Sequence, residues 1–151
     1  MAVTAFSIFL VDYLTKLAAV SFLADGPIKV LGNFLKFELI YNTGAAFSLA
    51  TSKTIFLSTF SMLVAAGIFY FAARVDSQKW ALALGSVLGG IFGNLSDRIF
   101  RSPGGLQGPV VDWISIPHWP VFNIADSAVV IGVLSIASLT WAKIPPRSAT
   151  K

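Results

Sequence analysis

The sequence contains no cysteine, a single histidine and few charged residues. The absence of cysteine excludes disulfides, thiolate metal sites and a cysteine nucleophile. One histidine, His118, cannot build a multi-histidine metal site. Charged residues make up 12% of the 151 residues, whereas soluble domains carry about 25%. Because 56% of the residues are hydrophobic, the composition indicates a chain surrounded by lipid rather than by water.

The net charge is +4, but the lysines and arginines are scattered along the chain. A nucleic-acid-binding surface requires basic residues that cluster on one face or one helix. We therefore expect no nucleic-acid partner.

Four stretches are long and apolar enough to cross a bilayer. A transmembrane helix needs about 20 mostly apolar residues, because each residue rises about 1.5 Å and the hydrocarbon layer is about 30 Å thick. The predicted spans cover residues 2–23, 54–73, 80–95 and 121–142. We do not expect the first span to be a cleaved signal peptide, because Asp12 and Lys16 interrupt its apolar centre. The sequence therefore predicts an all-α integral membrane protein.

Two connections between the spans, residues 24–53 and 97–120, are long enough to hold structure of their own. In the first, residues 29–41 are rich in Val, Ile, Phe, Tyr and Leu and are interrupted by Gly32. Such a pattern is typical of short strands joined by a turn. We predict a small extracytoplasmic β element over about residues 27–50, in a single membrane-embedded domain.

An even number of spans places both termini on the same side of the membrane. Cytoplasmic segments carry an excess of Lys and Arg. The two sides carry equal numbers of these residues, but on the terminal side they are packed into fewer residues, including the short hairpin 74–79. We therefore predict that both termini are cytoplasmic.

Four of the seven acidic residues lie inside or beside the predicted spans: Asp12, Asp97, Asp112 and Asp126. A charge at such a position costs about 2.5–3.5 kcal/mol on insertion scales, so it usually faces a partner or a wet cavity. Asp12 precedes Lys16 by four residues, which places both on one helix face and suits an ion pair.

Amide and charged side chains recur at helical spacing near the ends of two spans. Asn94, Asp97 and Arg98 lie at i, i+3 and i+4, and Asn123 and Asp126 repeat the i, i+3 spacing. Three of the four acidic residues in or beside the spans fall near one membrane face. Two nearby carboxylates cannot both ionise cheaply, so such a group suits shared-proton acid–base chemistry. A proton or ion pathway would use the same residues.

Other chemistries have less support. A serine–lysine dyad would pair Lys16 with Ser96 or Ser127, but Lys16 already has an acidic neighbour. Carboxylates without histidine or thiolate ligands are a poor set for a transition metal. Gly-x-Ser-x-Gly, His-Glu-x-x-His and phosphate-loop motifs do not occur. We expect neither a metal nor an organic cofactor.

Five short blocks stand out along the chain. They are DYLTK at 12–16, NTGAAFS at 42–48, GNLSDR at 93–98, VVDWI at 110–114 and FNIAD at 122–126. The same blocks occur in the same order in lipoprotein signal peptidases, or signal peptidase II, and the sequence resembles this family over nearly its whole length.

The resemblance implies an intramembrane aspartic endopeptidase of the bacterial inner membrane whose active site faces the periplasm. Its catalytic aspartates correspond to Asp112 and Asp126. The implied substrate is a prolipoprotein that carries diacylglycerol on a cysteine and is cut just before that cysteine. Positions that match substrate-binding or supporting residues are Asp12, Lys16, Asn42, Gly44, Asn94, Asp97, Arg98 and Asn123. We expect a monomer surrounded by membrane lipids.

The sequence departs from the family pattern at two places. Tyr13 stands where the family usually has glutamine, and the segment 101–109 is longer than expected. The glycines and prolines of that segment predict a flexible loop over the site. The small residues that begin at Gly44 would let a substrate backbone approach closely.

The two candidate catalytic aspartates differ in their expected protonation. Asp126 should lie in the first turn of the last helix, where free N–H groups and the macrodipole favour a carboxylate, with Asn123 as its donor. Asp112 lies between apolar neighbours and near that charge. Its pKa should therefore be raised, and it should hold the shared proton.

The rival hypothesis is a small transport subunit that conducts protons or ions through the buried aspartates. A relay should distribute ionisable groups across the depth of the bilayer, whereas three of these four cluster at one face. The clustering favours the peptidase.

Overall fold

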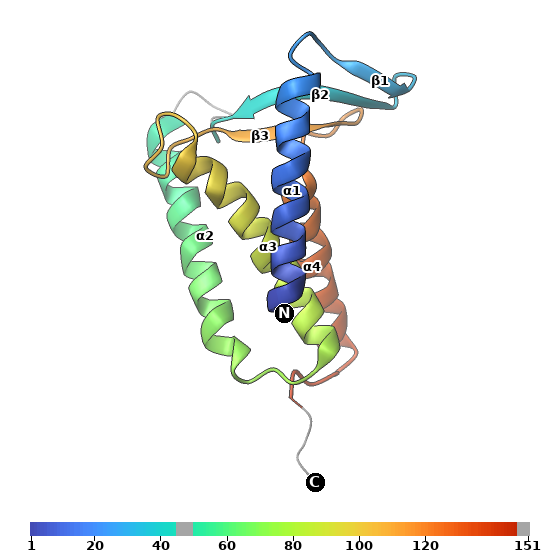
Figure 1. Cartoon of the computed structure of the whole chain (residues 1–151). Helices are drawn as coiled ribbons and strands as arrows, with labels where there is room; N and C mark the ends of the chain where they lie inside the picture. Colours follow the sequence, from blue (N-terminus) through green and yellow to red (C-terminus); the bar gives the residue numbers. More distant parts are fainter. Residues whose placement is uncertain (45–49, 148–151) are drawn as a thin grey trace.

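The computed structural model describes residues 1–44 and 50–147. Its elements are, in chain order, α1 (Ala2–Phe22), β1 (Ile28–Leu31), β2 (Leu35–Asn42), α2 (Ala50–Ala72), α3 (Gln78–Phe100), β3 (Val110–Ser115) and α4 (Ile124–Trp141). The helices run side by side, and the sheet lies across one end of the bundle (Figure 1). The N-terminus and the end of α4 lie away from the sheet.

Helix α3 is the centre of the bundle, because it packs against α1, α2 and α4, whereas the described part of α2 comes close to the backbone of α3 alone. Glycines permit the close approach. A Cβ atom on Gly89 would lie 2.7 Å from the carbonyl oxygen of Ala5 in α1, and one on Gly90 would clash with the backbone of α4 at Ala125. A larger side chain at either position would push a neighbouring helix away.

Three helical segments of the described chain are long and apolar enough to cross a membrane: Ala2–Phe22, Thr54–Ala72 and Ile124–Trp141. Helix α3 is 23 residues long but is less apolar, because it carries four glycines and the polar side chains of its last turns. The predicted membrane fold with a small sheet is thus confirmed, while the fourth span remains a prediction.

The sheet is antiparallel, with strand order β1-β2-β3. The predicted hairpin is confirmed, and its turn contains Gly32 at a φ of +55°. The third strand was not predicted, because the VVDWI block was interpreted only as an apolar run. β3 pairs with β2 so that Asp112 lies opposite Ile40. This register brings the second long connection to the first.

Two elements differ in extent from the predicted ranges. The β element ends at Asn42 rather than near residue 50, and α2 begins at Ala50. Helix α3 continues to Phe100, five residues beyond the predicted span 80–95. The predicted span followed apolar residues only, whereas the last turns of α3 carry polar side chains that contact other elements.

Candidate active site

Asp126 is fixed by a capping box at the start of α4. The Asn123 Oδ1 atom accepts the backbone N–H of Asp126 at 2.9 Å, and the Asp126 carboxylate accepts the backbone N–H of Asn123 at 3.2 Å. Reciprocal bonds of this kind satisfy N–H groups that the helix cannot. Asp126 therefore lies in the first turn, as predicted, where the helix dipole favours a negative charge.

Asp112 is carried by β3 and is 2% exposed. Its two carboxylate oxygens each accept an amide N–H. The Asn42 amide donates to Oδ2 at 2.8 Å, and the Asn123 amide donates to Oδ1 at 2.6 Å. Asn123 thus contacts both aspartates. It was expected to donate to Asp126, but its side-chain N–H group donates to Asp112 instead.

The environment of Asp112 favours its protonated form. Burial raises the pKa of Asp112 from 3.8 to about 6. The amide hydrogen bond from Asn42 opposes this rise, the charge of Asp126 adds to it, and the bond from Asn123 opposes it. A pKa near 6 allows this carboxyl to give or take a proton near neutral pH.

Asn94 supplies the side-chain donor to Asp126. Its Nδ2 atom donates to Asp126 Oδ1 at 2.7 Å. Its Oδ1 atom accepts N–H groups from Lys16 Nζ at 3.0 Å and from Asn123 Nδ2 at 3.1 Å. Because both of these donors require the carbonyl oxygen, the amide nitrogen is left to face the carboxylate.

Lys16 lies at the centre of a buried ion cluster. Its Nζ atom is 2.7 Å from Asp12 and 2.9 Å from Asp97. The predicted Asp12–Lys16 pair is confirmed, whereas the contact with Asp97 was not predicted. Lys16 is 1% exposed, so its charge requires both partners.

The same two carboxylates tie other elements to the cluster. Asp12 accepts the backbone N–H of Ala125 in α4 at 2.8 Å. Asp97 accepts the backbone N–H of Val111 in β3 at 3.2 Å and pairs with Arg101 Nε at 2.5 Å. Our sequence analysis missed Arg101, although its i, i+4 spacing from Asp97 signals an ion pair.

Arg98 is 9% exposed, and its Nη1 atom has no hydrogen-bond partner among the described residues. Its Nη2 atom lies 3.7 Å from the place that a Cβ atom on Gly44 would occupy. Gly44 has a φ of +77°, and its backbone N–H donates to Asn42 Oδ1 at 2.8 Å. A buried guanidinium nitrogen without an acceptor is suited to an incoming carbonyl or anion.

Of the two departures from the family pattern, Tyr13 is exposed, whereas the segment 101–109 is bonded to neighbouring helices. Tyr13 is 45% exposed, stacks on Phe9 and makes no hydrogen bond within the described chain. The segment 101–109, predicted to be a flexible loop over the site, is tied to two helices. Ser58 in α2 donates to the carbonyl of Leu106, and the N–H of Gly108 donates to the carbonyl of Arg98.

The predicted close-approach residues 45–47 lie outside the described residues.

The geometry brings together all the predicted site residues, from α1, β2, α3, β3 and the start of α4. Asn42, Asn94 and Asn123 contact the two candidate catalytic aspartates directly, and Asp12, Lys16 and Asp97 lie behind them. Within residues 1–44 and 50–147, no group of histidines and acidic residues is arranged to hold a metal ion. The arrangement suits acid–base chemistry by two carboxylates that are held in one polar network.

Comparison with known proteins gives consistent matches. The family model described as signal peptidase (SPase) II matches residues 4–142. A lipoprotein signal peptidase of Mycobacterium tuberculosis is 46% identical over 130 residues, which cover 85% of this chain and 64% of that protein. One of Rhodococcus jostii is 43% identical over 141 residues, covering 93% of this chain and 71% of that protein. The chain thus spans less than two thirds of the mycobacterial relative.

A solved structure supports the fold. It is described as a bacterial membrane enzyme, is 26% identical and superposes with a TM-score of 0.80. The match covers 95% of this chain and 92% of that chain.

Proposed function

This chain belongs to the signal peptidase II family, and on that premise we propose that it is an intramembrane aspartic endopeptidase. It removes signal peptides from diacylglyceryl-modified prolipoproteins by cutting just before the lipidated cysteine. The observation that carries the proposal is that Asp112 and Asp126 are both held by N–H donors, with Asn123 bonded to each of them, and make no ion pair within the described residues. The transport alternative receives no support from the family match.

The two carboxylates take complementary parts in the proposed reaction. Asp126, in the first turn of α4, acts as the base that removes a proton from water, and the water oxygen attacks the scissile carbonyl carbon. Asp112, with its pKa raised to about 6, gives its proton to the carbonyl oxygen. Collapse of the resulting diol breaks the C–N bond: Asp126 gives the proton it took from water to the leaving nitrogen, and Asp112 takes back a proton from a hydroxyl of the diol, so both carboxyls return to their starting states. No metal or organic cofactor takes part.

Arg98 and Gly44 supply the proposed substrate contacts. The unpartnered guanidinium nitrogen of Arg98 suits a carbonyl of the substrate backbone, and the missing side chain at Gly44 leaves room for that backbone. The amides of Asn42, Asn94 and Asn123 hold the catalytic carboxylates in place.

We further propose that α3 is the fourth span, so that one domain, working as a monomer, crosses the inner membrane four times. Both termini then lie in the cytoplasm, and the sheet and the site lie at the periplasmic face. A reporter fused after residue 151 or within 74–79 should behave as cytoplasmic, and one inserted within 104–108 as periplasmic. A periplasmic signal from the C-terminal fusion would overturn this orientation.

Cleavage of a diacylated reporter prolipoprotein by the purified protein in lipid is the direct test of function. The same reporter without the diacylglyceryl group should be cut poorly, because the lipid holds the substrate at the membrane surface. Equal rates on both forms would remove the lipid from recognition. Activity should survive EDTA, and a loss that zinc reversed would refute the aspartic mechanism.

A further inference from the structure

Two carboxylates outside the proposed catalytic pair each bind the residue that directly precedes a member of that pair. Asp12 on α1 accepts the backbone N–H of Ala125 at 2.8 Å through Oδ1. Asp97 on α3 accepts the backbone N–H of Val111 at 3.2 Å through Oδ2. The next residues along the chain are the proposed base and the proposed acid. Each of the two carboxylates therefore fixes the backbone beside one catalytic group.

Lys16 joins these two carboxylates. Its Nζ atom lies 2.7 Å from Asp12 Oδ2 and 2.9 Å from Asp97 Oδ2. An ammonium group has three N–H donors, and the third bond of Lys16 goes to Asn94 Oδ1 at 3.0 Å. We call the set of Asp12, Lys16 and Asp97 the Lys16 bridge. One ammonium nitrogen thus connects the peptide group beside the base to the peptide group beside the acid.

The segments that carry the catalytic pair, β3 and the start of α4, are also joined directly. The Asn123 amide donates to Asp112, and Ile114 and Phe122 exchange backbone hydrogen bonds. These contacts involve the strand and the start of α4 only. The Lys16 bridge ties both segments to α1 and α3, so it limits how far one segment can tilt against the other.

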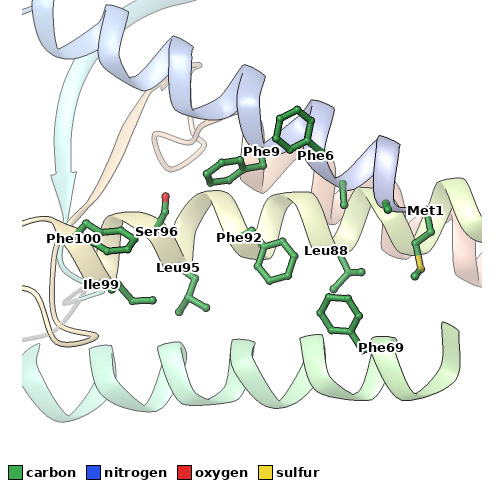
Figure 2. Close-up of a pocket in the computed structure, with 12 residues that line it drawn as sticks. Met1, Phe6, Phe9, Phe69, Leu88, Phe92, Leu95, Ser96, Ile99 and Phe100 are labelled. Carbon is green, nitrogen blue, oxygen red and sulfur yellow. The ribbon is translucent and has the colours of Figure 1, made fainter.

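The Lys16 bridge is enclosed by protein, since all three of its side chains are buried. A Cβ atom on Gly93 would lie 2.5 Å from Asp12 Oδ2, so this glycine leaves the space that the carboxylate fills. Figure 2 shows a different side of α3, where apolar side chains line a groove between α1 and α2, and the bridge residues are not among them. The buried ammonium group therefore depends on its protein acceptors.

We infer that Lys16 is a positioning residue that sets the separation of the two catalytic carboxylates. The inference rests on the proposed function, because it takes Asp112 and Asp126 as the catalytic pair. Within the described residues Lys16 bonds to neither of them, so it acts through the peptide groups that precede them. A misplacement of about 1 Å in a catalytic arrangement can cost about 10²-fold in rate.

The double variant Asp12→Asn/Lys16→Met separates positioning from stability. Lys16→Met alone leaves two buried carboxylates without their shared cation. Adding Asp12→Asn removes one of these charges, while Asp97 keeps its ion pair with Arg101. The double variant should therefore recover most of the melting temperature that Lys16→Met loses. Its kcat on a diacylated reporter should stay about tenfold or more below that of the wild type, with KM within about twofold.

Recovery of kcat together with the melting temperature would show that Lys16 serves stability alone, and the inference would be wrong. If the double variant does not fold, Asp12→Asn replaces it in the test. The two oxygens of Asp12 serve Ala125 and Lys16 separately, and an amide has only one oxygen to offer. This variant should lower kcat with little change in KM, and a wild-type kcat would equally contradict the inference.

Arg101→Gln is the matched control. Arg101 pairs with the same Asp97 carboxylate through Oδ1, and Asp97 uses Oδ2 for Lys16. Removing the guanidinium group therefore weakens the ion cluster but leaves the Lys16 bridge in place. The kcat of this variant should stay within about twofold of the wild type. A loss as large as that of the double variant would mean that any lost charge at Asp97 slows the reaction, which would exclude a specific role of the bridge.

Hydrogen exchange at the Ala125 and Val111 amides, followed by NMR in detergent, tests the inference without a cleavage assay. Both N–H groups donate to carboxylates of the bridge, so their exchange should be about tenfold faster in Asp12→Asn/Lys16→Met and unchanged in Arg101→Gln. Unchanged exchange in the double variant would overturn the inference. An inactive wild type would instead refute the proposed function, and the exchange rates would still show whether Lys16 holds the two peptide groups.

Discussion

Two pairs of aspartates lie within one polar core, and they are held in opposite ways. Asp12 and Asp97 both contact the ammonium group of Lys16, and Asp97 also pairs with Arg101. Within the described residues, Asp112 and Asp126 make no ion pair; their carboxylates accept N–H groups from amides and from the backbone. The ion pairs are thus concentrated on Asp12 and Asp97, whereas Asp112 and Asp126 are held by N–H groups.

The two kinds of partner suit different roles: an ion pair keeps a carboxylate charged, whereas amide donors let it exchange a proton. An adjacent cation strongly favours the ionised form of a carboxylate, which then serves as a fixed anchor. An amide N–H group favours the ionised form more weakly. A carboxylate held by amides therefore keeps its position and can still exchange a proton. We therefore propose that Asp12 and Asp97 are anchors and that Asp112 and Asp126 are the catalytic pair.

The largest expected effect is on catalysis. Asp112→Asn and Asp126→Asn keep the size of the side chain but cannot accept or release the proton, so each should lower the cleavage rate by about 10²–10⁴-fold or more. The melting temperature of each variant should be no lower than that of the wild type. Asp25→Asn, at an exposed acidic residue outside the site, should leave the rate unchanged. Full activity of either well-folded site variant would remove that residue from the pair.

The next largest effect is on stability. Lys16→Met leaves Asp12 and Asp97 buried without their shared cation, which should cost about 3–5 kcal/mol of unfolding free energy. Thermal unfolding in detergent measures the loss. Lys29→Met, at an exposed lysine, should change stability by less than about 0.5 kcal/mol. If both lysine variants melted like the wild type, the ion cluster would not be an anchor.

Local spacing explains which parts of this core the sequence predicts. The i, i+4 spacing of Asp12 and Lys16 fixes their contact within one helix, and the i, i+3 spacing of Asn123 and Asp126 anticipates the helix cap. The membrane class follows from composition, and the hairpin follows from Gly32 between two β-rich runs. All of these depend on residues close together in the chain.

The contacts that complete the site depend on long-range pairing. Asn42 reaches Asp112 because β2 pairs with β3 across 70 residues. Lys16 reaches Asn94 because α1 packs on α3 across 78 residues. Periodicity carries no information about either pairing, so the third strand and the full set of donors to the carboxylates required the structure.

The smallest effect is a shift in the pH profile, and it tests whether amides tune the catalytic pair. In the proposed mechanism Asp112 must be protonated, so activity should fall as the pH rises through its pKa of about 6. Asn42 donates to this carboxylate and lowers its pKa. Asn42→Ala removes the donor, so the pKa should rise and the alkaline limb should move up by about one pH unit.

Stability provides an independent check on the sign of this shift. The pKa of Asp112 is higher in the folded protein than its ordinary 3.8. Its contribution to stability is therefore fully present below pH 3.8 and is lost as the pH rises through about 6. The wild type should lose melting temperature relative to Asp112→Asn between about pH 4 and 7, and Asn42→Ala should lose it over a higher range. An alkaline limb that stayed in place in Asn42→Ala, or moved down, would show that Asp112 is not the group that must hold the proton.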